Sequence, residues 1–211
     1  TITEQTMGID RFYGILNVLR GLNYIEDNGI PTKKLKISRQ ICSGPEVLLL
    51  TEILVENLLL DLQPKEIPLL LSIICFETRP TQEFSSKELF KIIQNEKFIT
   101  VVQKVQAIYC NIKYLEKENG IANEEFLNFE MISVIQQWCN GSEFHLLQKY
   151  TDKKEGTIVR SIMKIDRFLD LIKSFAKDNY QANLIIKVES ALELLRRDII
   201  NATSLYLINE K

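Results

Sequence analysis

The clearest pattern of apolar and polar positions in the chain lies between Thr151 and Lys177. A helix that starts near Gly156 and turns by about 100° per residue brings a set of apolar side chains onto one face, at alternating spacings of four and three. The set is Ile158, Ile162, Ile165, Leu169, Ile172 and Ala176. A stripe of this kind is typical of a helix that packs one face against a core. The sequence therefore predicts a long helix over residues 156–177, around which the remaining helices are organised.

Three basic side chains follow the same spacing on roughly the opposite side of this predicted helix. They are Arg160, Lys164 and Arg167, and we call them the basic row. From periodicity alone, a charged row opposite a core face is most simply a solvated surface. Its function has to be judged from other features of the chain.

Helical periodicity and turn signals predict helices along most of the remaining chain. In the first and last of these helices, the apolar stripe indicates which side chains face inward. The inward sets are Phe12, Ile15, Leu16, Leu19 and Leu22 in the first helix, and Leu184, Val188, Ala191, Leu195, Ile199 and Ala202 in the last. Six of the expected helices have both ends defined: 10–22, 65–76, 98–118, 124–138, 142–150 and 181–207. Two more are expected between them. One is opened by residues 43–46 and includes the apolar run 47–62, and the other is capped by Ser85 or Ser86.

Strand signal is confined to residues 24–37. Asp27-Asn28-Gly29 is a tight-turn sequence, and the alternating Leu35 and Ile37 follow it. The predicted fold is therefore mostly α, a multi-helix bundle with a small β-hairpin near the N-terminus. We interpret residues 1–40 as the end of a winged-helix element and residues 41–211 as a helical bundle that contains the long helix.

Composition is that of an ordinary globular protein, with 45% apolar and 26% charged residues among 211. The formal net charge of −2 excludes a general attraction to nucleic acid, so any such contact has to be local. The apolar runs are too short to cross a bilayer, so no membrane partner is expected. A chain that starts at Thr1 and soon enters an amphipathic helix is expected to be part of a larger protein.

The chain offers little for covalent or metal chemistry. Its four cysteines are widely spaced and are expected to be buried free thiols: Cys42, Cys75, Cys110 and Cys139. His145 is the only histidine and cannot complete a zinc cluster or, on its own, indicate a triad. A Gly-rich phosphate loop and a GxSxG motif are both missing from the sequence. We expect no catalytic residue, no metal and no cofactor in this segment.

Several separated stretches, in order and spacing, resemble one family of helicase domains. They are LNYIEDNG (22–29), ICSGPEVLLLTE (41–52), LDLQPKEI (60–67), QWCNGSEF (137–144), TDKKEGTIVR (151–160) and RRDIINATSLYL (196–207). These stretches resemble the family patterns LGYID-DG, ISS…LLLTE, DLxPEEI, YEWAxGxxF, TDxxEGSIVR and KRDIVxAASLYL. The chain is thereby similar to the C-terminal helical (DSHCT) domain of DExH-box RNA helicases of the superkiller and exosome-cofactor type.

The resemblance implies an ATP-dependent RNA helicase as the parent chain, with ATP and Mg bound by two RecA-like domains of that chain. The DSHCT domain closes over the RecA-like domains and completes an RNA channel. Exosome-associated proteins are the implied protein partners. The implied location is nuclear, with the cytoplasm as the alternative.

In this family, the helix that corresponds to residues 156–177 is the ratchet helix, which contacts single-stranded RNA. The implied RNA-binding residues are Arg160, Lys164, Arg167 and, near another contact position of the family, Glu77. Family members often carry Arg at the position of Lys164 and an acidic residue near that of Arg167. Because Lys offers a point charge and Arg a planar fork, the departure at Lys164 favours phosphate contact over base stacking.

Two other functions fit parts of the pattern. In a helix-turn-helix DNA-binding module, residues 142–150 would be the first helix and the basic row the recognition face. The net charge of −2 and the short stretch explained argue against this reading. A helical protein-interaction adaptor, with the basic row merely solvated, is the other alternative. Nucleic-acid binding separates the three functions. The helicase domain should prefer single strands, the DNA-binding module should prefer duplex, and the adaptor should bind neither.

Overall fold

The computed structural model describes residues 2–41, 46–75, 89, 91–122 and 127–197. These residues are mostly helical, which confirms the predicted class. The chain forms two compact units, Thr1–Leu58 with Val102–Glu125 and Leu59–Val101 with Phe126–Lys211. We call them unit 1 and unit 2 and describe each by itself. The predicted boundary after residue 40 remains a prediction.

Unit 1 contains α1 (Ile2–Gly21), α2 (Lys33–Ile41), α3 (Val47–Val55) and most of α6 (Glu96–Glu118). The buried face of α1 runs through Gly14 and Val18 to Leu22, just after the helix. A Cβ atom added at Gly14 would lie 2.5 Å from the Asn119 carbonyl oxygen, so only glycine permits this approach.

The predicted inward face of the first helix is partly wrong. Leu22 is buried and Leu16 and Leu19 are half-buried, but Phe12 and Ile15 are exposed, at 58% and 41%. Because α1 meets the end of α6 through the stripe that contains the small Gly14, these two large side chains are turned outward.

The predicted β-hairpin is also wrong. The turn itself forms, since the Gly29 N–H donates to the Glu26 carbonyl at 2.8 Å and Gly29 has φ +85°. Over residues 24–37, however, pairing is limited to one antiparallel bridge between Ile25 and Pro31. Lys33 then begins α2, whose buried Ile37 and Ile41 have helical spacing.

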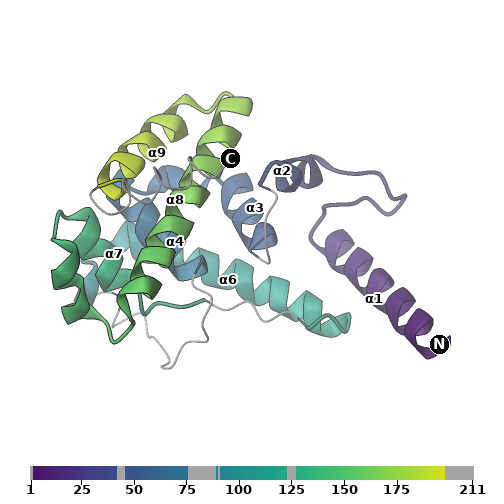
Figure 1. Cartoon of the computed structure of the whole chain (residues 1–211). Coiled ribbons are helices and arrows are strands. Elements are labelled where there is room, and N and C mark those ends of the chain that lie inside the picture. The colour runs from purple at the N-terminus through teal and green to yellow at the C-terminus, as the bar shows by residue number, and fades with distance from the viewer. Residues whose placement is uncertain (1, 42–45, 76–88, 90, 123–126, 198–211) are drawn as a thin grey trace, which may run out of the picture. The chain divides into compact units, whose positions relative to one another are not determined.

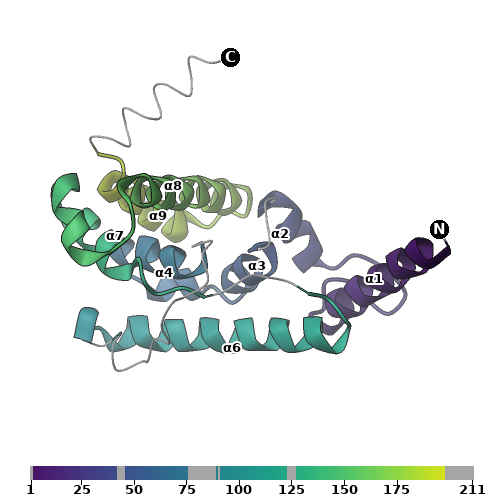
Figure 2. The ribbon, with the colours of Figure 1, turned by 60° about the horizontal axis from the view of Figure 1, so that its bottom comes forward.

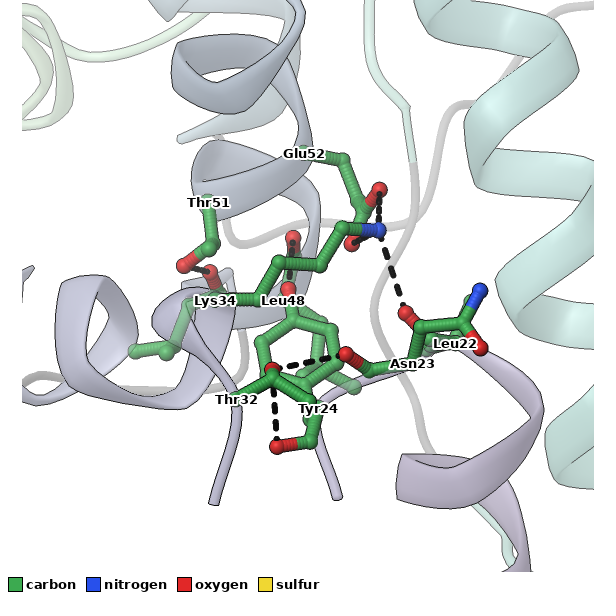
Figure 3. A network of polar contacts seen from close by, with 9 residues as sticks. Leu22, Asn23, Tyr24, Thr32, Lys34, Leu48, Thr51 and Glu52 are labelled. Carbon is green, nitrogen blue, oxygen red and sulfur yellow. Dashed lines mark hydrogen bonds and ion pairs between the residues drawn. The ribbon is translucent and has the colours of Figure 1, made fainter. Parts of the chain in front are cut away.

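A polar network joins the end of α1 to α2 and α3 (Figure 3). The Lys34 ammonium donates to both Glu52 carboxylate oxygens, at 3.0 and 2.8 Å, and to the Leu22 carbonyl at 3.1 Å. Tyr24, which is completely buried, donates from its hydroxyl to the Leu48 carbonyl at 3.4 Å. Burial, and then the negative charge of Glu52, raise the Tyr24 pKa far above its usual range. The network thus ties together two of the motif stretches, 22–29 and 41–52.

Unit 2 is built on α4 (Ile67–Ile74), which is buried at every residue. The helices α8 (Glu155–Asp178) and α9 (Ala182–Leu195) lie side by side, and both pack on α4 (Figures 1 and 2). Shorter elements complete the unit: η1 (Leu58–Asp61), η2 (Pro64–Glu66), α7 (Ile132–Cys139) and η3 (Phe144–Tyr150). Pro64 begins η2, and the Glu66 carboxylate accepts from the Gln63 N–H at 2.8 Å, which closes a capping box.

Two helices of unit 2 differ most from their predicted ranges. The helix expected over 124–138 begins only at Ile132, because Asn128 before it donates its N–H to the Ile73 carbonyl and accepts the Glu130 N–H on its side chain. The helix expected over 181–207 ends at Leu195, although its predicted inward side chains as far as Leu195 are all buried. Ile199 and Ala202 lie outside the described residues.

The end of α9 is set by a contact from α7. The Trp138 indole N–H donates to the Leu195 carbonyl at 2.8 Å, and Arg197 lies against the indole ring. Among the cysteines, Cys75 and Cys139 are buried as predicted, whereas Cys110 is exposed, contrary to prediction. Cys42 falls outside the described part of the chain.

Candidate nucleic-acid interface on helix α8

The short loop before α8 is held by side chains on both sides. Gln148 donates to the Lys153 carbonyl at 2.7 Å, and the Lys153 ammonium pairs with Glu130 at 3.0 Å. The backbone of Lys154 is extended, and α8 follows directly. The helix therefore starts from a fixed point and runs for 24 residues, about 36 Å.

The buried face of α8 contains every apolar residue predicted for it. Each member of the set from Ile158 to Ala176 has at most 1% of its surface exposed, and Phe168 and Phe175 are buried beside them. Because this face packs on α4 and α9, the helix is fixed in rotation and the opposite side points away from the core.

The basic row lies on that opposite side, as the periodicity predicts, but its members differ in burial. Arg160 and Arg167 are exposed, whereas Lys164 is half-buried and has an interaction within the chain. Within the described residues, neither arginine has a hydrogen-bond or ion-pair partner. The two arginines are seven positions apart, which is about 10 Å along the helix axis. They offer two accessible guanidinium groups, each suited to a phosphate or to the face of a base.

A line of ion pairs connects α8 to α9 beside the basic row. Arg196, just after α9, contacts Asp166 and Asp170 of α8, and the Arg196 Nε lies 2.7 Å from the nearer Asp166 oxygen. The hydrogen bond to Asp166 raises the pKa of Arg196. Further along, Lys173 lies 2.9 Å from Glu189 and, by that hydrogen bond, lowers the carboxyl pKa of Glu189.

The remaining predicted site residue, Glu77, lies outside the described residues, so its relation to α8 stays a prediction. Sequence reasoning missed Arg196. Its partners, Asp166 and Asp170, have the i, i+4 spacing of one helix face, but the cation that joins them comes from a different helix.

The described residues contain no group of three or more His, Cys, Asp or Glu side chains placed to hold a metal ion. In that same part of the chain, no helix is long and apolar enough to span a membrane. The surface of α8 presents a row of positive charges, a chemistry that suits a polyanion. The fold and this surface together define a helical domain with a candidate nucleic-acid interface.

Comparison with known proteins gives the family. The DSHCT (NUC185) domain matches residues 28–203, and the chain belongs to this family. It is 30% identical to the antiviral helicase SKI2 of Saccharomyces cerevisiae over 91% of the chain and 15% of that protein. It is also 30% identical to the human superkiller complex protein 2, over 96% of the chain and 16% of that protein.

A relative whose name differs from the SKI2 and superkiller names is also similar over nearly the whole chain. Identity to the ATP-dependent RNA helicase mtr4 of Schizosaccharomyces pombe is 26%, over 97% of the chain and 18% of that protein. The chain thus spans less than a fifth of each of these three relatives. The similarity supports a C-terminal accessory domain of a DExH-box RNA helicase, as the motif stretches predicted.

Proposed function

We propose that this domain closes over the RecA-like core of an ATP-dependent RNA helicase and contacts single-stranded RNA through α8, as a ratchet helix. The observation that carries the proposal is the pair of exposed guanidinium groups, Arg160 and Arg167, opposite a completely buried stripe on the same helix. A rigid helix that presents charges along a line can hold successive phosphates of a strand without reorganising.

Lys164 lies between the two arginines and belongs to the same predicted contact set, together with Glu77. Because Lys164 is half-buried and already interacts within the chain, we expect it to add positive charge to the surface without contacting the strand as directly as the arginines do. We therefore assign the main contacts to Arg160 and Arg167. In this proposal the helicase core supplies ATP and Mg, and the bound strand is delivered to the exosome through exosome-associated proteins.

The names of the relatives include both superkiller and mtr4 helicases, at similar identity. The nuclear location that we predict, with the cytoplasm as the alternative, therefore remains a prediction. The same holds for the particular protein partners.

Binding of labelled oligouridine to the full-length protein that contains this chain tests the proposal. Arg160→Ala with Arg167→Ala should weaken binding and reduce the salt slope by about 0.7 for each lost phosphate contact. Loss of base stacking would instead cost on the order of 1–3 kcal/mol with little change in slope. Lys177→Ala is the matched control, since Lys177 is an exposed cation on α8 outside the basic row.

The alternatives give different results in the same assay. A helix-turn-helix module prefers duplex DNA to single strands, and Arg160→Ala with Arg167→Ala would weaken that binding. A protein-interaction adaptor binds neither nucleic acid, and the double variant would then equal the control. Either result would contradict the proposed function.

A further inference from the structure

Two carboxylates lie next to the basic row on α8. Asp170 is the i+3 neighbour of Arg167 on the helix surface, and Asp166 directly precedes Arg167 in the chain. Left alone, the pair would place two negative charges where an RNA phosphate has to approach. Asp170 would also be a competing partner for the Arg167 guanidinium.

Arg196 occupies both carboxylates. Its Nε donates to one oxygen of Asp166 at 2.7 Å, and its Nη2 donates to the other at 3.2 Å and to Asp170. The charge-assisted, two-pronged geometry is the strongest arrangement available to a guanidinium and a carboxylate. Arg196 therefore offsets one of the two negative charges beside Arg167 and keeps Asp170 engaged.

The position of Arg196 is set from the core of unit 2. The α9 helix ends one residue earlier, where the Leu195 carbonyl accepts the indole N–H of the buried Trp138. Arg197, on the other side, is fixed by hydrogen bonds to the Trp138 and Ser142 carbonyls. The Leu195 backbone and the Arg197 side chain are thus both held, and the Arg196 side chain between them reaches α8.

We infer that Arg196 is a positioning residue for RNA contact, which engages Asp166 and Asp170 and offsets one of their two negative charges, so that Arg167 stays available to a phosphate. This inference rests on the proposed function of α8. Arg196 needs no contact with RNA in this role. Removing it should weaken RNA binding through the two carboxylates that it leaves uncovered, and removing those carboxylates as well should restore binding.

The test is the affinity of the full-length protein for labelled oligouridine, measured by fluorescence anisotropy at fixed salt. Arg196→Ala should weaken binding on the order of three- to tenfold, because one positive charge is lost beside the strand and Asp170 becomes free to pair with Arg167. The Asp166→Asn, Asp170→Asn double variant should bind at least as tightly as the unmodified protein. The triple variant that combines all three changes should recover at least the affinity of the unmodified protein, since removing two negative charges more than offsets the loss of one positive charge.

Glu189→Gln is the matched control for loss of an ion pair between the same two helices. It breaks the Lys173 contact but uncovers no carboxylate on α8, so RNA affinity should not fall. If Arg196→Ala weakens binding and the triple variant does not recover, Arg196 acts by direct contact or by holding α9, and the inference is overturned. Unchanged affinity in Arg196→Ala overturns it too.

The RNA contact of Arg160 and Arg167 and the role of Arg196 can be tested separately. If Arg160→Ala with Arg167→Ala leaves affinity unchanged, the proposed function fails and the inference falls with it. If that pair weakens binding but Arg196→Ala does not, only the inference fails. A melting temperature for each variant identifies any loss of affinity that comes from unfolding.

Discussion

The Arg197 guanidinium lies over the indole ring of Trp138, with its central carbon 4.0 Å from the ring centroid. The same guanidinium donates to the carbonyls of Trp138 and, at 2.9 Å, of Ser142. Two motif stretches that are far apart in the sequence, 137–144 and 196–207, thereby meet at one point. This contact joins α7 to the residues that follow α9, and the neighbouring Arg196 then contacts α8.

Arg197→Ala should therefore destabilise the chain. The substitution removes a cation–π contact and the hydrogen bonds to the Trp138 and Ser142 carbonyls, of which the Trp138 carbonyl keeps the Gly141 N–H at 3.0 Å, for an expected loss of about 2–4 kcal/mol. Urea unfolding of the 211-residue chain measures the change. Arg196→Ala is the adjacent control and should cost at most about 1 kcal/mol, since its ion pairs are partly exposed. Equal losses for the two variants would show that the Trp138 contact is not what holds this end together.

The same substitution, isoleucine to alanine, should change the free energy of unfolding very differently at a buried and at an exposed position of unit 2. Ile162→Ala should cost roughly 2–5 kcal/mol, because Ile162 is completely buried on α8. Ile186→Ala on α9 should stay within about 0.5 kcal/mol, because Ile186 is 62% exposed. Thermal unfolding under identical conditions gives both values. A small effect at Ile162 would mean that α8 does not pack as described.

The stability that Lys34 and Glu52 contribute should come from their pairing and not from the charge of either residue alone. Lys34→Ala leaves Glu52, which is only 6% exposed, without its cation, and should cost about 1–3 kcal/mol. Lys36→Ala, an exposed lysine on the same helix, serves as the control and should change little. Combining Lys34→Met with Glu52→Gln should recover much of the loss, since no buried charge then remains unpaired. If the double variant is as unstable as the two single changes added together, the pair is not coupled.

Thiol reactivity should separate two cysteines. Burial raises the pKa of the Cys139 thiol to about 12, against the opposing charge of Arg197, whereas Cys110 is exposed. Iodoacetamide at pH 8 should therefore label Cys110 and spare Cys139 in the folded chain, as read by peptide mass spectrometry. The folded state holds the Cys139 proton where the unfolded chain releases it near pH 9, so the free energy of unfolding should fall as pH rises from about 9 to 12. Rapid native labelling of Cys139 would contradict its burial.

Local periodicity was enough to predict α8 and its buried face, because one stripe from Ile158 to Ala176 fits only one helix rotation. Local periodicity failed in two other places. The strand expected at Leu35 and Ile37 became a helix after a single bridge, since the side chains that α2 buries follow helical rather than alternating spacing. The last helix stops at Leu195 because of an indole donor far away in the sequence.

In the candidate site, too, some features could be predicted from the sequence and others only from the fold. The spacing of Arg160, Lys164 and Arg167 places them on one side of α8, but it does not reveal that Lys164 is half-buried. Nor does it show that Arg196 lies against Asp166 and Asp170, because that contact depends on how α9 packs on α8. Charge placement within one helix is readable from sequence, whereas charge cancellation between helices needs the fold.

Strand separation by the full-length protein that contains this chain tests most directly the central claim, the proposed contact of α8 with single-stranded RNA. Arg160→Ala, Lys164→Ala and Arg167→Ala together should slow unwinding of a tailed RNA duplex while leaving the folded state and RNA-independent ATP hydrolysis intact. Because these side chains are exposed or half-buried, the triple variant should keep the stability of the unmodified protein to within about 1 kcal/mol. Unwinding at the unmodified rate by this triple variant would contradict the account and leave the basic row as a solvated face.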